Sequence, residues 1–292
     1  MEIYRRSLDE LLARYELEPT LRDVYVEGLT DKVIIEWFLE QCKQTNYAVY
    51  DIDTVEIPAE LLFSEGLVDN NRSRVIFLAL YIEKHLSNSK SVICIADRDF
   101  SLILNNENIS SKFLLFTDYT SMDIYLFNEV IIEKFCRLVL RIPNLVAKDV
   151  LDNLSQVLEE LFLIRATNQI LKLEMEWLSF DRCCSFKDNL IEFQTEIFIE
   201  RYLNKNGKIA EKNLFIAKFR ELRTSNIIDI RYKIRGKDFL ELLCWYIKPY
   251  LSKDKRSFSE LEVVRGSLLG CLELNFLLQE NLFEQLLQRV SS

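Results

Sequence analysis

The chain has 292 residues, of which 49% are hydrophobic and 28% charged, and it carries a formal net charge of −9. Only 6 glycines and 4 prolines interrupt it, which is too few for an all-β fold and favours a helix-rich globular protein. No apolar run reaches the roughly 18 residues of a membrane span, and the opening MEIYRRSLDELLARYE has no signal-peptide core. We therefore expect a cytoplasmic protein without a membrane partner.

The first half of the chain alternates strand patterns with helix patterns. Expected strands are β-branched, aromatic or apolar runs, and they cover residues 22–28, 47–57, 91–100 and 112–119. Expected helices have apolar residues at helical spacing, and they cover residues 6–18, 30–42, 71–86 and 121–140. This alternation predicts an α/β fold with a mostly parallel sheet flanked by helices.

The second half is predicted to be mainly α-helical. Its long helical patterns cover residues 147–177, 186–203, 208–223, 237–250 and 258–289. We therefore expect two domains, an α/β domain over residues 1–143 and a helical domain over residues 144–292.

The C-terminal run 258–290 is rich in Leu and Phe, and Gly266 and Gly270 lie four residues apart where two helices could approach closely. Most of this run is expected to lie in the core of the helical domain. A terminal helix that buries two faces needs a second partner surface, which a two-fold interface commonly supplies. The run therefore also suggests a homodimer.

Acidic residues follow three of the expected strands. Glu27 ends the first strand, Asp97 and Asp99 end the third, and Asp118 ends the fourth, with Asp123 just beyond. Because the carboxyl ends of parallel strands share one edge of the sheet, these acids should lie close together. Such a cluster repels itself unless a cation neutralises it, and carboxylates suit Mg²⁺ or Mn²⁺.

Each acid also has a simpler interpretation when it is taken alone. Asp31 follows Thr30 at the start of an expected helix, where an acid favours the helix N-terminus. Asp97 and Asp99 could be solvated loop acids after a strand. The joint placement favours a metal site, and Gly28 after Glu27 would leave room for a metal or a phosphate.

These motifs resemble the TOPRIM domain of topoisomerases, primases and nucleases over roughly residues 20–140. The resemblance rests on Glu27-Gly28 with Asp31 and on ADRD, which carries Asp97 and Asp99. The stretches YVEGLTDKVIIEWFL, ICIADRDF, FTDYTSMDIYLF and IRGKDFLELL, in this order, are similar to the standalone subfamily that accompanies an ATPase. That subfamily includes the nuclease subunit of the PARIS anti-phage defence system.

The resemblance implies a Mg²⁺-dependent endonuclease that acts as a toxin when an ATPase partner releases it. Glu27, Asp97 and Asp99 would hold the metal, and Asp31 or Asp123 would complete the site. The family pattern leads us to expect glutamate where this chain has Asp123, whose reach is shorter. RNA, especially tRNA, is the implied substrate. A DNA nuclease and a non-catalytic nucleic-acid-binding regulatory subunit remain the alternatives.

A basic segment covers residues 201–256, where 15 Lys and Arg stand against 6 Asp and Glu. The segment thus has a net charge of +9 and the rest of the chain a net charge of −18. Aromatic residues are interleaved with the basic ones. This combination suits nucleic acid, although helical spacing also predicts that most of the rings are core residues. Arg231, Lys233 and Arg235 alternate as if along one face of a strand, and Lys237 is a candidate for stabilising transition-state charge.

Other catalytic chemistries have little support in the sequence. The single histidine, His85, leaves little basis for a histidine-dependent acid–base scheme. The 7 cysteines lack a CxxC pair, so neither a zinc site nor a disulfide framework is expected. No G-x-x-x-x-G-K-[ST] motif is present, and an ATPase would therefore have to be a separate partner.

Overall fold

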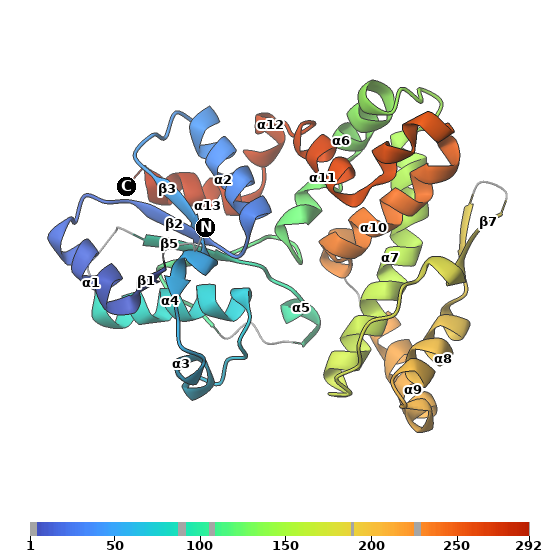
Figure 1. Ribbon diagram of the computed structural model, residues 1–292, viewed down its shortest axis with the longest axis horizontal. Coiled ribbons are helices and arrows are strands. Elements are labelled where there is room, and N and C mark those ends of the chain that lie inside the picture. Colours follow the sequence, from blue (N-terminus) through green and yellow to red (C-terminus); the bar gives the residue numbers. More distant parts are fainter. Residues whose placement is uncertain (1–4, 87–91, 105–108, 188–189, 225–228, 292) are drawn as a thin grey trace. The chain divides into compact units, whose positions relative to one another are not determined.

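The computed structural model describes residues 5–86, 92–104, 109–187, 190–224 and 229–291 (Figure 1). The chain divides into two compact units. The first comprises residues 1–98, 106–122 and 273–292, and the second comprises residues 99–105 and 123–272. This division differs from the expected boundary at residue 143, because residues 123–143 and 99–105 belong to the second unit and residues 273–292 return to the first. Residue 91 of an expected strand, residues 188–189 of an expected helix and residues 225–228 of the basic segment lie outside the described residues.

The first unit contains a four-stranded parallel sheet with helices on its faces (Figure 1), which confirms the α/β class. The strand order is β3-β2-β5-β6. The strands are β2 (Asp23–Val26), β3 (Ala48–Asp51), β5 (Val92–Ala96) and β6 (Leu114–Phe116). A separate parallel pair joins β1 (Arg6–Ser7) to β4 (Val55–Glu56), and the 3₁₀ turn η1 (Ile52–Thr54) divides the expected strand 47–57.

The helices of the first unit cover both faces of the sheet (Figure 1). They are α1 (Leu8–Leu17), α2 (Leu29–Gln41), α3 (Ala59–Ser64), α4 (Asn71–His85), α12 (Leu274–Leu277) and α13 (Asn281–Val290). Tyr25 packs with residues of α1 and α4 in one core cluster, whereas its neighbours Val24 and Val26 are buried outside that cluster. Alternate side chains of a strand face opposite sides, so β2 is covered on both faces. That is why its sequence is apolar without alternation.

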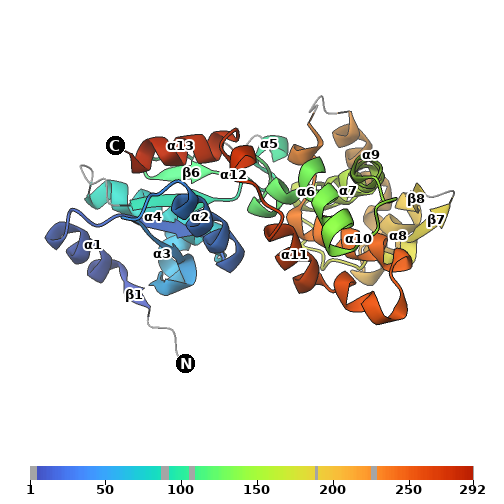
Figure 2. The same cartoon turned by 90° about the horizontal axis from the view of Figure 1, so that it is seen from above.

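The C-terminal helix α13 belongs to the first unit and lies along β6 (Figure 2). Its Phe283 packs on Phe38 of α2, with ring centroids 4.7 Å apart. At its N-terminus the Leu282 N–H donates to Asp118 Oδ2 at 3.0 Å, and the Asn281 amide donates to Asp118 Oδ1 at 3.1 Å. Asp118 therefore caps the start of α13, and its place in the expected acidic rim stays a prediction. The expected helix 258–289 is wrong as one element, because α11 (Leu261–Leu269), α12 and α13 are separate.

Replacing Asp118 by alanine should lower the free energy of unfolding by about 1–2 kcal/mol, because the start of α13 loses a buried acceptor. Urea titration followed by circular dichroism measures the change. Glu284→Ala is the control, because it removes a carboxylate from the exposed side of the same helix. It should cost less than about 0.5 kcal/mol. Equal stability of Asp118→Ala and the wild type would contradict this role.

The second unit is built around the long helix α7 (Ala147–Ile170) and contains mainly helices. The other α-helices are α5 (Ser101–Leu104), α6 (Glu129–Lys134), α8 (Thr195–Lys205), α9 (Lys212–Arg223), α10 (Gly236–Ile247) and α11 (Leu261–Leu269). Short 3₁₀ turns are η2 (Met122–Leu126), η4 (Asp181–Cys183), η5 (Ile209–Glu211), η6 (Ile230–Lys233), η7 (Lys248–Tyr250) and η8 (Lys253–Ser259), and η3 (Phe135–Val139) is a π-helix. Among the described helices, none combines the length and apolar character needed to cross a membrane.

One antiparallel hairpin in the second unit replaces the start of the expected helix 186–203. It joins β7 (Cys184–Lys187) to β8 (Leu190–Phe193), and α8 begins only at Thr195. Phe186 of the hairpin stacks on Trp245 of α10, with ring centroids 4.8 Å apart and planes 8° apart. Tertiary packing of this ring supports the hairpin, which local helical spacing did not predict.

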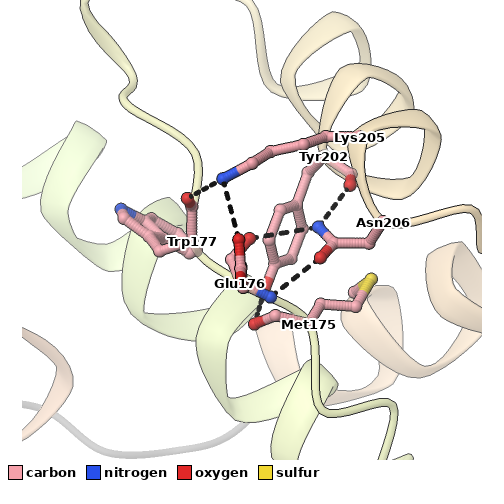
Figure 3. Close-up of polar contacts among 6 residues, drawn as sticks. All are labelled: Met175, Glu176, Trp177, Tyr202, Lys205 and Asn206. Atoms are coloured by element: carbon pink, nitrogen blue, oxygen red, sulfur yellow. Dashed lines mark hydrogen bonds and ion pairs between the residues drawn. The ribbon is translucent and has the colours of Figure 1, made fainter.

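Side chains of α8 and of its C-cap Asn206 form hydrogen bonds with the backbone of the segment after α7 (Figure 3). The Asn206 amide accepts from the Glu176 N–H at 2.8 Å and donates to the Glu176 carbonyl at 3.0 Å. Lys205 donates to the Trp177 carbonyl at 2.8 Å, and the Tyr202 hydroxyl donates to the Met175 carbonyl at 3.2 Å. Three side chains thus fix an irregular segment and place Trp177.

Candidate functional site

The carboxyl ends of β2 and β5 form the best-placed candidate site in the first unit. The chain passes from β2 to β3 on one side of β2, whereas β5 pairs with β2 on the other side. The strand order therefore reverses between β2 and β5. In open α/β sheets, ligands bind in the crevice outside the carboxyl ends of the strands at such a point.

Glu27 and Asp97 meet at this edge of the sheet, as their positions after two strands predict. The Asp97 N–H donates to Glu27 Oε1 at 2.7 Å, and the Met122 N–H donates to Asp97 Oδ1 at 3.0 Å. Both acids are half-buried. One oxygen of each carboxylate therefore accepts a backbone hydrogen bond, which fixes the orientation of the side chain.

Two arginines, which the sequence reasoning missed, lie at the same edge. Arg72 Nε, near the start of α4, donates to the Asp97 carbonyl at 2.6 Å. Arg98 Nε donates to the Thr117 carbonyl at 3.0 Å, and the Arg98 N–H donates to Thr117 Oγ1 at 3.0 Å. The edge therefore combines carboxylates with guanidinium groups, and guanidinium groups suit phosphate. Of these two arginines, only Arg98 could have been noticed from the sequence, because it lies inside the ADRD motif.

Asp31 has the role of a helix-capping residue. Its Oδ2 accepts from the Gly28 N–H at 3.1 Å, and Asp31 is the third residue of α2. This geometry matches the simpler interpretation, in which an acid in the first turn satisfies a backbone donor of the helix. A metal-binding role for Asp31 stays a prediction.

Gly28 is required neither by its backbone conformation nor by crowding within the protein. Its φ of −153° is an extended value that any residue adopts, and an added Cβ would meet only Asp31 Oδ2, at 4.0 Å. We therefore expect Gly28→Ala to change the free energy of unfolding by less than about 0.5 kcal/mol. If the glycine serves ligand approach, the same variant should lose nucleic-acid cleavage. Thermal unfolding and a cleavage assay, run in parallel, separate the effect on stability from the effect on cleavage. A large loss of stability would contradict the expectation that Gly28 is not needed for folding.

Asp99 and Asp123, the remaining predicted ligands, belong to the second unit. Asp99 has a left-handed backbone with φ of 49°, which Asp tolerates better than most residues. Asp123 faces Arg265, whose Nε lies 3.9 Å from Asp123 Oδ1, and neither atom has a hydrogen-bond partner among the described residues. Burial raises the pKa of Asp123, and Arg265 opposes that rise.

The fit of a metal ion depends on how many carboxylates it needs. Among the residues that the structure describes, no group of three or more Asp, Glu, His or Cys could hold a metal ion. The expected site of three to five carboxylates is therefore not preformed in this part of the chain. Mg²⁺ commonly takes one or two carboxylates together with substrate phosphates, and Glu27 with Asp97 suits that smaller requirement.

The predicted nucleic-acid face at residues 231–235 is not a strand. Residues 230–233 form the 3₁₀ turn η6, so alternation does not place the three basic side chains on one face. Arg231 forms an ion pair with Asp229 at 2.7 Å, and the buried Lys233 forms one with Glu159 at 2.9 Å. Arg235 lies with its guanidinium carbon 5.9 Å from the centre of the Phe100 ring.

Lys237 is an exposed residue at the start of α10, and its Nζ lies 3.9 Å from Glu241 Oε1. Five further basic residues of the segment also face acids within the described part of the chain. These ion pairs are Lys205–Glu176, Lys212–Glu200, Lys218–Glu221, Arg220–Glu196 and Arg223–Glu160. Most of the aromatic residues in the segment lie in the core, as helical spacing predicts. The buried rings are Tyr202, Phe215, Phe219, Phe239 and Tyr246.

Comparison with known proteins gives no independent assignment of this site. Neither a protein-family model nor a curated protein matches the chain. The candidate site therefore depends on its own geometry and on the motif resemblance.

Proposed function

We propose that the chain is a metal-dependent nuclease whose centre lies at the carboxyl edge of the sheet in the first unit. The observation that carries the proposal is the Glu27 carboxylate held on the Asp97 backbone at the point where the strand order reverses. Glu27 and Asp97 would hold Mg²⁺ or Mn²⁺ together with a substrate phosphate. The metal would supply Lewis-acid stabilisation and an activated water.

The two arginines of the site would bind and orient the phosphodiester. Arg72 and Arg98 are each fixed by hydrogen bonds to carbonyls of the strand ends, so their positive charges are held at the edge. Fixed charges stabilise a developing negative charge without reorganising during the reaction. Lys237, Arg231 and Arg235 remain candidates for further contact with the nucleic acid, whereas Lys233 would first have to leave Glu159.

The biological setting belongs to the same proposal and depends on the motif resemblance alone. In that setting, a cytoplasmic homodimeric TOPRIM-like toxin is restrained by an ATPase partner and cleaves RNA, with tRNA as the favoured substrate, during anti-phage defence. The direct test offers labelled tRNA, single-stranded RNA and duplex DNA to the pure protein in Mg²⁺, Mn²⁺ or EDTA. We expect metal-dependent cleavage of RNA. Cleavage of duplex DNA without cleavage of RNA would identify DNA as the substrate instead.

A non-catalytic nucleic-acid-binding subunit is the second candidate function. It is favoured by the lack of a group of three potential metal ligands among the described residues. Binding of nucleic acid without cleavage under every metal condition would favour this candidate.

A further inference from the structure

The central helix of the second unit, α7, presents one polar side to two adjoining cavities. Asp149, Asp152, Gln156 and Glu160 follow each other at spacings of three or four residues, which places them along one side of a helix. One cavity of about 440 Å³ is lined by Asp149, Asp152 and Gln156, and the other, of about 320 Å³, by Gln156 and Glu160. Gln156 lines both, so the two cavities adjoin along α7, and together they are called the α7 groove below.

The described residues that line the larger cavity include acids, aromatic rings and apolar side chains, and none of them is basic. Asp149 and Asp152 are exposed, and neither forms an ion pair within the described part of the chain. Tyr246 and Tyr250 form one wall, with ring centroids 5.7 Å apart. The exposed side chains of Val146 and Leu190 line the same cavity and offer apolar surface. Carboxylates beside tyrosine rings attract organic cations.

The smaller cavity contains a buried acid with an unused acceptor. Glu160 is 8% exposed, and one of its oxygens forms an ion pair with Arg223. The other oxygen, Oε2, is buried and has no hydrogen-bond partner among the described residues. Burial raises the pKa of Glu160, and Arg223 and the Thr195 side chain partly offset that rise. A donor supplied by a ligand would remove the cost of leaving this oxygen unpaired.

We infer that this groove binds a linear organic polycation, with ammonium or guanidinium groups spaced along an aliphatic chain. One cationic group would lie between Asp149, Asp152 and the Tyr250 ring, and another would donate to Glu160 Oε2. The helix rise of about 1.5 Å per residue puts Asp149 and Glu160 about 16 Å apart along α7. A free polyamine and the basic side chains of a partner peptide both have this chemistry. The site belongs to the second unit, whereas the proposed nuclease centre belongs to the first.

Calorimetric titration of the full chain at low salt tests the inference with spermine, spermidine, putrescine and a tetra-arginine peptide. Spermine should bind at least about tenfold more tightly than putrescine, since only a long chain can reach both acidic positions. Whichever of spermine and the tetra-arginine peptide binds with higher affinity identifies whether the cation is a free polyamine or a partner peptide. Absence of saturable binding by both would overturn the inference.

Variants distinguish this groove from general attraction to a protein of net charge −9. Asp152→Asn and Glu160→Gln should each weaken spermine binding by about tenfold, because each removes one charge-assisted hydrogen bond. Glu133→Gln, an exposed acid of α6 paired with Arg137, is the matched control and should bind as the wild type does. Asp152 is exposed, so its variant stays informative if Glu160→Gln disturbs Arg223. Equal affinity of all four proteins would overturn the inference.

Discussion

Replacing Glu27 by glutamine is expected to reduce metal-dependent nucleic-acid cleavage by at least about 100-fold. Glutamine keeps the side-chain length and an oxygen that can accept the Asp97 N–H, which in the wild type lies 2.7 Å from Glu27 Oε1. It removes the negative charge, and with it the affinity of the site for a divalent cation. The substitution therefore separates the charge from the geometry. Initial rates at several Mg²⁺ concentrations measure the effect.

The control for this experiment is Glu40→Gln, which removes one exposed acid near the end of α2. Its cleavage rate and melting temperature should match those of the wild type. Glu27→Gln should also melt within a few degrees of the wild type, which excludes unfolding as the cause. Unchanged cleavage by folded Glu27→Gln would reject Glu27 as a metal ligand and with it the proposed centre.

The first unit could be predicted in outline because strand and helix patterns alternate along it. Glu27 and Asp97 could be paired from sequence since parallel strands bring their carboxyl ends to one edge. The same rule did not show that Asp118, which follows β6, accepts hydrogen bonds from the start of α13. Periodicity shows which face of a helix is buried, but it does not show which unit buries it. The return of residues 273–292 to the first unit was therefore not predictable from the pattern.

The basic segment shows a second limit of the sequence. The alternation of Arg231, Lys233 and Arg235 suggested a strand, yet η6 turns the chain and Lys233 lies buried beside Glu159. An acid far away in the sequence thus decides the position of this lysine. Local charge counts identify a segment rich in cations, but they cannot show which cations already have partners.

The largest stability effect is expected for Arg165→Met, which should lower the free energy of unfolding by about 3–5 kcal/mol. Arg165 Nε and Nη2 each donate to a carboxylate oxygen of Asp238 at 2.7 Å. Asp238 is 1% exposed, so the variant leaves a buried carboxylate without its partner. The guanidinium carbon also lies 3.4 Å from the centre of the Trp177 ring. Urea titration measures the loss, and tryptophan fluorescence reports the change beside Trp177.

A double-mutant cycle separates the ion pair from the contact with Trp177. Asp238→Asn retains most of the volume and removes the charge, so the double variant Arg165→Met with Asp238→Asn should be more stable than the sum of the single losses predicts. Part of the loss should persist, because methionine cannot supply the cation that lies over Trp177, whose backbone is fixed by Lys205 (Figure 3). Strictly additive losses would mean that Arg165 and Asp238 act independently. The buried pair would then not be the reason for the stability of α7 against α10.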